Sequence, residues 1–486
     1  MSEPSAPVTE PAARSGHGAP PGAAVLSGTA APSATPVPAP APPEPVESDR
    51  FRAFLVLWGS QTLSLFGTMV SQFAVNVWLA RDLFPLASQK PQLALALTAT
   101  GFAATGPLIF AMPIAGAFAD RHDRRRILVT TNTVLALLSV VLVLLTASHR
   151  LVLPLAVTLL LGYSLASSFH SAAFDSSYGR FVAAASLPRA SGMMMTSFGL
   201  AQLLAPPLAA ALIGLPALMG DAKNLPAWLA NGIPFAFAAD ALSFVIAACT
   251  ALALRFPPAP VAPGPRASLL DDARAGLRWV LRRRPFVWLI SFGSLANFTF
   301  APLMVLLPLL ARDHVAADAA RAKLSFESVL ALANTAGGLG GVLGGIVVSV
   351  VGLRRWRKTQ VMLVCLVVLG VGEVIAGLAP TVWGLAAGMF VGELLVAPLN
   401  TASFTLWQSL TPPHMLARAL ATRRFIAQSA FPIGTVIAGW TAAVFEPWLV
   451  VTLSGALLAL WTAAQLATPG FRTLEDRMHE AAARPD

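Results

Sequence analysis

Long apolar runs separated by short polar turns occupy the chain from residue 52 to residue 468. Each run is long enough to cross the hydrocarbon core of a bilayer, which takes about 20 helical residues. A backbone inside a bilayer must satisfy its own hydrogen bonds, so runs of this length predict helices. The pattern predicts twelve of them: 52–81, 92–119, 127–147, 151–178, 189–217, 232–255, 286–312, 327–351, 358–379, 382–411, 417–445 and 447–468. We therefore expect an all-α, polytopic membrane protein.

The composition agrees with this class and argues against soluble enzymes. Hydrophobic residues make up 56% of the chain and charged residues only 12%, whereas soluble domains carry about 25% charged residues. The two cysteines support neither a disulfide framework nor a metal site. A phosphate-binding Gly-Lys-Ser/Thr loop is absent from the sequence. We expect no enzyme activity, no cofactor and no metal.

The basic residues predict the orientation. Twelve segments place both ends of the chain on one side, and the turns and flanks of that side carry 25 Lys and Arg residues against seven on the other. Cytoplasmic loops hold the excess of Lys and Arg, so both termini are expected inside the cell. The net charge of +10 is explained by this topology, and we expect no nucleic-acid partner.

The longest predicted cytoplasmic connection divides the segments six and six. Its leucines and arginines recur at helical spacing between 269 and 284, which predicts a basic helix on the membrane surface. The tail before the first segment holds twelve prolines within residues 1–46, and we expect it to be disordered. The predicted regions are a Pro/Ala-rich cytoplasmic tail (1–50), a six-helix half (51–255), a central loop (256–285), a second six-helix half (286–468) and a cytoplasmic tail (469–486).

An internal repeat supports the two halves. A shift of 229 residues superposes four glycine and arginine positions: Gly116 on Gly345, Arg125 on Arg354, Arg126 on Arg355 and Arg189 on Arg418. The turn after the second segment therefore has a counterpart after the eighth. Two six-helix repeats in parallel orientation are the plan of one large class of transporters.

The turn after the second segment also carries a motif. It runs from a glycine through Asp-Arg to a basic cluster, and its residues are Gly116, Asp120, Arg121, Asp123, Arg124 and Arg125. This motif resembles the loop signature of the major facilitator superfamily. The stretches 187–190, 273–285 and 408–419 are similar to the branch that contains enterobactin-exporter-like and macrolide-efflux-like proteins. The resemblance covers residues 50–470. It implies a monomer in the cell (inner) membrane that moves a small molecule by rocking its two halves, driven by the proton gradient.

The resemblance implies that the motif is a cytoplasmic latch. Gly116 would let two helices touch, and Asp120 would accept hydrogen bonds from the amino end of a neighbouring helix. Arg124 would pair with Asp175 near the cytoplasmic end of the fourth segment. Arg121 and Arg125 complete the predicted gate. The alternative is that these arginines only enforce the topology.

Three carboxyl side chains fall inside apolar segments, where acids are costly and mark functional sites. Glu393 lies about 16 Å along its helix at 1.5 Å per residue, close to the bilayer midplane. The family lines its central cavity with segments 1, 4, 7 and 10, so the resemblance makes Glu393 the preferred site of proton coupling. Asp240 and Glu373 fall on segments 6 and 9 and are the other coupling candidates.

Polar and aromatic side chains on the expected cavity helices suit an amphipathic substrate. The candidates for the substrate cavity are Gln72, Asn76, His170, Asn297, Phe298, Asn400 and Gln428. Taken singly, each of them is better explained by helix packing than by substrate binding.

The sequence predicts a transporter, with proton-coupled export favoured by the resemblance. Two features depart from the proton-coupled members. The fifth segment has Ala201 and Ala205 where antiporters carry glycines, and the fourth segment offers Tyr163 and His170 instead of an arginine. Uptake, lipid translocation and a transport-inactive receptor or scaffold of the same fold therefore remain open. The identity of the substrate is open as well.

Overall fold

The chain folds entirely into helices in the part that the computed structural model describes, residues 45–182, 186–218, 231–256, 269–352 and 356–468. This confirms the predicted all-α class. Residues 1–44 and 469–486 lie outside the described residues, so the expected disorder of the amino-terminal tail stays a prediction there. Residues 45–50, which belong to the same predicted tail, form the start of α1. The helices of the first half are α1 (Pro45–Val77), η1 (Trp78–Leu83), η2 (Ala87–Gln89), α2 (Lys90–Arg121), α3 (Arg124–Ala147), α4 (Leu153–Phe181), α5 (Leu187–Leu218) and α7 (Ile233–Ala253).

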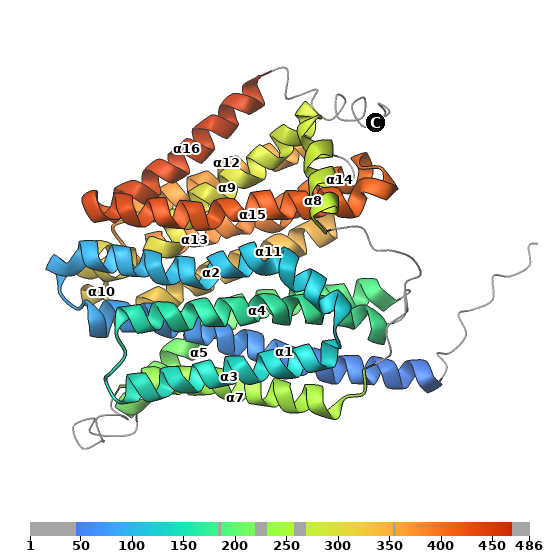
Figure 1. Cartoon of the computed structure of the whole chain (residues 1–486). Coiled ribbons are helices and arrows are strands. Elements are labelled where there is room, and N and C mark those ends of the chain that lie inside the picture. The colour runs from blue at the N-terminus through green and yellow to red at the C-terminus, as the bar shows by residue number, and fades with distance from the viewer. Residues whose placement is uncertain (1–44, 183–185, 219–230, 257–268, 353–355, 469–486) are drawn as a thin grey trace, which may run out of the picture. The chain divides into compact units, whose positions relative to one another are not determined.

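The second half begins after α8 (Leu269–Leu281), the helix expected in the central connection. Its helices are α9 (Arg284–Leu309), η5 (Leu310–His314), α10 (Ala316–Arg321), α11 (Phe326–Val351), α12 (Lys358–Leu378), α13 (Val382–Leu394), α14 (Val396–Leu410), α15 (Pro413–Val444) and α16 (Pro447–Ala467). Helix α8 lies at one end of the bundle and α10 at the other (Figure 1).

Eleven helices of the described part are long and apolar enough to cross a membrane. They correspond to eleven of the twelve predicted segments. The remaining one, 417–445, is the 32-residue helix α15, whose arginines and glutamine lower its hydropathy. Helix α15 packs along α2 and α9, so it belongs to the same bundle.

The predicted segment 382–411 is two helices rather than one. Helix α13 ends at Leu394 and α14 begins at Val396, with Leu395 between them. Pro398 lies in the first turn of α14. Because proline has no backbone N–H, the Leu394 carbonyl loses its partner four residues ahead. The break therefore has a local cause in the sequence.

The helix starts follow familiar chemistry. Proline occupies the first turn of α2, α9 and α16, where the missing N–H costs nothing. The Asp123 carboxylate accepts a hydrogen bond from the Arg125 N–H and caps α3. The Ser325 hydroxyl caps α11 in the same way. These caps place the charged turns at the ends of the apolar helices.

Each half is a six-helix unit, and the most extensive helix contacts between the halves are those of α2 with α15 and of α5 with α11. In the first half α3 packs against α7 and α2 against α4, and in the second half α12 packs against α16 and α9 against α15. The site described below lies in the first of these units.

Glycines allow α11 to approach α13 at backbone distance. A methyl group on Gly344 would lie 2.9 Å from the Leu394 carbonyl carbon, and one on Gly340 would lie 3.1 Å from that of Phe390. At Gly341 and Gly345 of the same helix, the Cβ position has no described neighbour within 4 Å. The glycine-rich face of α11 is therefore a packing surface only at some of its positions.

We predict that Gly344→Ala destabilises the protein by about 1–3 kcal/mol, the usual cost of overpacking a tight contact. Thermal unfolding followed by tryptophan fluorescence measures the effect. Gly341→Ala is the matched control, because its methyl group meets open space. Equal unfolding midpoints for the two variants would contradict the close approach of α11 and α13.

Candidate functional site

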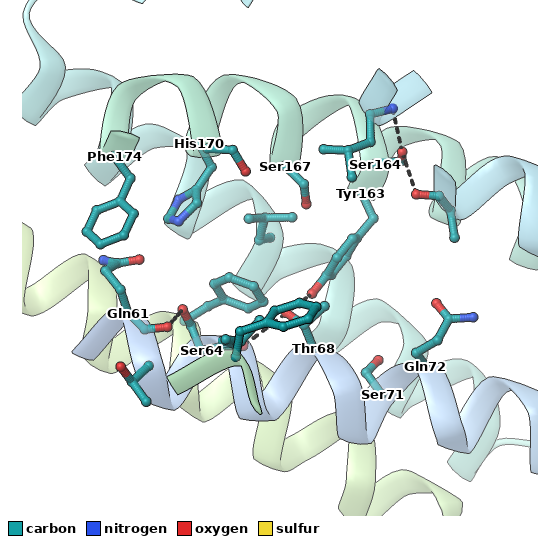
Figure 2. Close-up of a pocket in the computed structure, with 18 of the residues that line it drawn as sticks. Gln61, Ser64, Thr68, Ser71, Gln72, Tyr163, Ser164, Ser167, His170 and Phe174 are labelled. Atoms are coloured by element: carbon teal, nitrogen blue, oxygen red, sulfur yellow. Dashed lines mark hydrogen bonds between the residues drawn. The ribbon is translucent and has the colours of Figure 1, made fainter. Parts of the chain in front are cut away.

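A cavity of about 510 Å³ lies within the first half. Helices α1, α2, α4 and α5 supply most of its wall, and α3 and α7 contribute further side chains. Of its described lining residues, Arg424 alone comes from the second half. Figure 2 shows the wall formed by α1 and α4.

One wall of the cavity is a row of polar side chains on α1. Gln61, Ser64, Thr68, Ser71 and Gln72 line the cavity. Their spacing of three or four residues places them on one face of the helix. A second row lies on α4 and consists of Tyr163, Ser164, Ser167, His170 and Phe174. Figure 2 shows Tyr163, His170 and Phe174 pointing toward α1 across the cavity.

The other parts of the wall combine apolar side chains with a few polar and charged ones, among them Asp175 and Arg424. Met112 of α2 and Met194 of α5 line the cavity together with Phe198 and Phe244. Methionine side chains adapt to irregular shapes, and aromatic rings offer flat apolar surface. An apolar wall with convergent polar groups suits a small amphipathic molecule.

A buried carboxylate is linked to this cavity. Asp240 of α7 is fully buried. Its Oδ2 accepts a hydrogen bond of 2.7 Å from the Ser139 hydroxyl and lies 3.4 Å from the Tyr163 hydroxyl. The Tyr163 hydroxyl is in turn 2.8 Å from that of Thr68. Since Tyr163 and Thr68 line the cavity, two hydroxyl groups connect the Asp240 carboxyl to it.

Ser164 joins α4 to the backbone of α2. Its hydroxyl donates to the Ala104 carbonyl at 2.8 Å and accepts from the Leu108 N–H at 2.9 Å. These two groups are four residues apart in α2, next to Pro107. A side chain inserted between such groups is a known cause of helix bending. The cavity wall thus includes an irregular point of α2.

The structure brings only two of the seven predicted cavity residues into the cavity. Gln72 and His170 line it, whereas Asn76, Asn297, Asn400 and Gln428 do not. The Asn297 amide donates to the Gly293 carbonyl of its own helix. Phe298 lines a separate groove on the second half. These residues lie outside this cavity because it is built almost wholly by the first half.

The coupling candidates are also separated from one another. The Glu393 side chain lies beside Gly337 of α11, where a methyl group would be 3.4 Å from its Cγ. Glu373 is fully buried, with neither carboxylate oxygen bonded to a described residue, and packs against Gly455 of α16. Neither glutamate lines the cavity. Asp240 is the candidate that is connected to it.

The predicted gate motif is arranged differently from the expected latch. Arg124 forms a 3.2 Å ion pair with Asp120, and its Nη1 donates to the Ser176 carbonyl rather than to Asp175. Asp175 instead lines the cavity. No described residue lies within 4 Å of the Cβ position of Gly116, so it makes no close contact with a described helix. The expected Arg124–Asp175 pair and the Gly116 contact are therefore wrong for this conformation.

The two other arginines of the motif lie at the same end. The Arg125 guanidinium donates to the Ala251 and Leu252 carbonyls at the end of α7, where cations favour the helix terminus. Arg121 is exposed. The motif therefore joins α2, α3, α4 and α7 of one half.

Sequence reasoning missed most of the cavity residues. The row from Gln61 to Gln72 is visible as polar residues at helical spacing within an apolar segment. The sequence therefore contained a signal for this row of cavity residues. Arg424 carried no comparable signal, because its place at the cavity depends on how α15 packs against the first half.

The opposite end of the bundle is held by polar contacts between the halves. Arg81 of η1 pairs with Glu327 of α11 at 3.2 Å, and Lys90 pairs with Glu446. Arg312 of η5 donates to the Phe84 carbonyl at 2.6 Å and also reaches the Ala80 carbonyl. We call these contacts the clasp.

The two clasp arginines share a sequence motif. Leu-Ala-Arg-Asp occurs at 79–82 and again at 310–313. Both copies lie in π-helical turns at corresponding helix ends of the two halves, and such turns are frequent at functional sites. In each copy the aspartate binds its neighbouring arginine, at 2.9 and 2.7 Å. The clasp is thus a second trace of the internal repeat.

Comparison with known proteins agrees with these observations. The sequence profile of the family described as transmembrane secretion effector matches residues 44–483. Macrolide efflux protein A of Streptococcus pyogenes is 22% identical over 399 residues, which cover 79% of this chain and 88% of that protein.

Solved structures of transporters share the fold. A bacterial homologue of the human lysosomal transporter Spinster, in an inward-facing and unoccupied conformation, superposes with a TM-score of 0.60 at 14% identity, covering 92% of this chain and all of that one. A D-xylose-proton symporter gives 0.61 at 15% identity, covering 85% and 97%. These identities establish similarity of fold alone.

Proposed function

The chain belongs to the transmembrane secretion effector family of major facilitator transporters, and we propose that it exports a small amphipathic molecule from the cell. The observation that carries the proposal is the cavity of about 510 Å³, whose wall combines polar side chains of α1 and α4 with methionine, phenylalanine and leucine side chains. The relative named for macrolide efflux supports export and an amphipathic cargo.

Transport would proceed by alternating access. The clasp joins the halves at one end of the bundle, while at the other end Arg124 and Arg125 of the motif bond to α4 and α7 of the first half. The excess of Lys and Arg supports a cytoplasmic location for the motif end and for both termini. The conformation described here would then be the one that loads substrate from the cytoplasm.

Coupling to the proton gradient would use Asp240. Its carboxyl is buried, and the Tyr163 and Thr68 hydroxyls connect it to the substrate cavity. Buried acids connected by polar side chains are the usual route of protons through membrane transporters. Glu393, the candidate favoured by its depth in the sequence, has no comparable connection to the cavity. Export would bring a proton in as substrate leaves.

The test is an accumulation assay in a host that lacks its own efflux pumps. Cells producing the chain are expected to accumulate less of at least one amphipathic compound, macrolides included, and a protonophore should abolish the difference. Ser71→Trp fills the cavity and should abolish it too. Leu137→Trp, on an exposed face of α3, is the matched control.

The amount of the protein in the cell membrane must be equal in all strains that produce it. Equal accumulation of every compound with and without the chain would favour a receptor or scaffold over a transporter. Accumulation raised by the chain would point to uptake instead.

A further inference from the structure

A second hollow, separate from the cavity, lies on the second half. It has a volume of about 680 Å³, and its described lining comes from α8, α9, α15 and α16, with nothing from α1–α7. We call it the lateral groove. Its walls include Ser294, Phe298, Ile426, Ala430, Leu457 and Trp461.

The lateral groove opens on an apolar outer surface. Along α9 it is lined from Val287 to Phe298, about 16 Å of helix at 1.5 Å per residue. Leu457 on its rim is 50% exposed, and Leu453 and Leu460 of the same helix are 60% and 71% exposed. Contiguous exposed leucines on a membrane helix face the acyl chains of the bilayer. The groove is therefore accessible from the lipid phase.

The lining chemistry suits a hydrocarbon chain. Two hydroxyl groups interrupt the apolar wall. The Ser291 hydroxyl bonds to the Val287 carbonyl of its own helix. The Ser294 hydroxyl is buried and bonds to no described residue, which leaves one donor for an occupant. An elongated and almost wholly apolar occupant fits this wall.

The α8 segment that lines one end of the lateral groove is rich in arginine. Val280 and Leu281 of α8 line the groove, and Arg278, Arg282 and Arg284 lie beside them in the chain. These three arginines are exposed and form no ion pair with a described residue. Their positive charge therefore remains available to an external anion next to the residues of α8 that line the groove.

The position of α8 is fixed by two packing contacts. A methyl group on Gly276 would lie 2.7 Å from the Arg418 carbonyl oxygen, so α8 rests on the backbone of α15. The Arg283 guanidinium lies 4.4 Å from the Trp279 ring and donates to the Trp279 carbonyl. Arg283 is thus used within the protein, unlike the three exposed arginines.

We propose that the lateral groove binds one anionic phospholipid. The acyl chain would occupy the wall between Val287 and Phe298, and the phosphate would contact Arg278, Arg282 and Arg284. A basic site between helices, next to an apolar surface in the same leaflet, is the arrangement that selects anionic lipids. A free phosphate would leave the groove empty, and a neutral lipid would leave the arginines unpaired. This site is independent of the transported cargo.

Native mass spectrometry of the purified full chain tests the proposal. Dioleoylphosphatidylglycerol and dioleoylphosphatidylcholine are titrated separately, and we expect one phosphatidylglycerol to bind roughly tenfold more tightly, a difference typical of a few charge contacts. Arg278→Gln/Arg282→Gln should reduce its affinity to that of phosphatidylcholine. Ala430→Trp fills the groove and should remove the site for both lipids.

Matched variants separate the site from general charge and surface effects. Arg52→Gln/Arg126→Gln removes two exposed arginines of the first half, and Leu137→Trp enlarges an exposed side chain on α3. Both should bind phosphatidylglycerol like the parent chain. If Ala430→Trp fails to fold, Ser294→Leu narrows the groove less severely. Equal affinity in the groove variants and the controls would overturn the proposal.

Discussion

Asp240→Asn is expected to lower proton-driven export by about 100-fold, the order of effect seen when a positioned proton-transfer group is removed. The carboxyl is the buried acid that hydroxyl groups connect to the cavity. Asparagine has a similar size and keeps a hydrogen-bond acceptor, but it cannot exchange a proton. Export is measured in proteoliposomes with an imposed pH gradient, using a compound identified by the accumulation assay.

A second measurement separates coupling from folding. Exchange of labelled substrate at equal pH on both sides requires the cavity and the rocking of the halves but no net proton movement, so Asp240→Asn should retain it. Glu373→Gln and Glu393→Gln are the matched controls, because these acids do not line the cavity. If Glu393→Gln loses export while Asp240→Asn exports normally, the coupling residue is Glu393 of α13 and our assignment of Asp240 is wrong.

Arg81→Gln/Arg312→Gln is expected to shift the protein toward opening at the clasp end. Arg81 loses its ion pair with Glu327, and Arg312 loses charge-assisted donation to the Phe84 carbonyl. Hydrogen bonds to charged groups contribute about 1.5–3 kcal/mol each, and solvent exposure reduces this at Arg81, so the ratio of the two conformations should change at least about tenfold. A shift of that size would slow the return step of the transport cycle.

Spin labels measure this shift directly. Cysteines introduced at Ser148 and Arg321 place one label on each half at the clasp end, after the native Cys249 and Cys365 are replaced. The distance between the labels should increase in the double variant. Arg150→Gln removes an exposed arginine near the same end and should leave the distance unchanged. An unchanged distance in the double variant would show that the clasp does not hold this conformation.

The two predictions concern opposite parts of the same cycle. Asp240 would decide whether the proton gradient drives the change of conformation, and the clasp would decide how stable one conformation is. Loss of proton-driven export together with normal substrate exchange points to Asp240. A change in both the export rate and the exchange rate points to the clasp. The assays therefore assign each effect to its own residues.

The helices and the family motif could be read from the residues alone. Apolar runs of bilayer length leave the backbone no alternative to helix, because every N–H and C=O must be bonded within its own segment. The turn from Gly116 to Arg125 identifies its loop without knowledge of any contact. Even the break in the predicted segment 382–411 has a local signal, Pro398.

The site could not be assembled in the same way. Its depth along the helix singled out Glu393, but depth does not say which face of the helix meets the cavity. The face that carries Glu393 packs against Gly337 of α11 instead. Asp240 was one of three buried coupling candidates in the sequence, and its hydrogen bond to Ser139 and its approach to Tyr163 are what distinguish it from the other two. Arg424 reaches the cavity from the other half of the chain.

The sequence by itself therefore determined the membrane class, the helical segments, the two-half plan and the family of this protein, since these depend on hydropathy, charge distribution and local motifs. Only the tertiary structure decided which polar side chains surround the cavity, which buried acid is connected to it, and which arginines join the halves. The physical reason is that helix periodicity sets the face on which a residue lies, but only packing sets what that face meets.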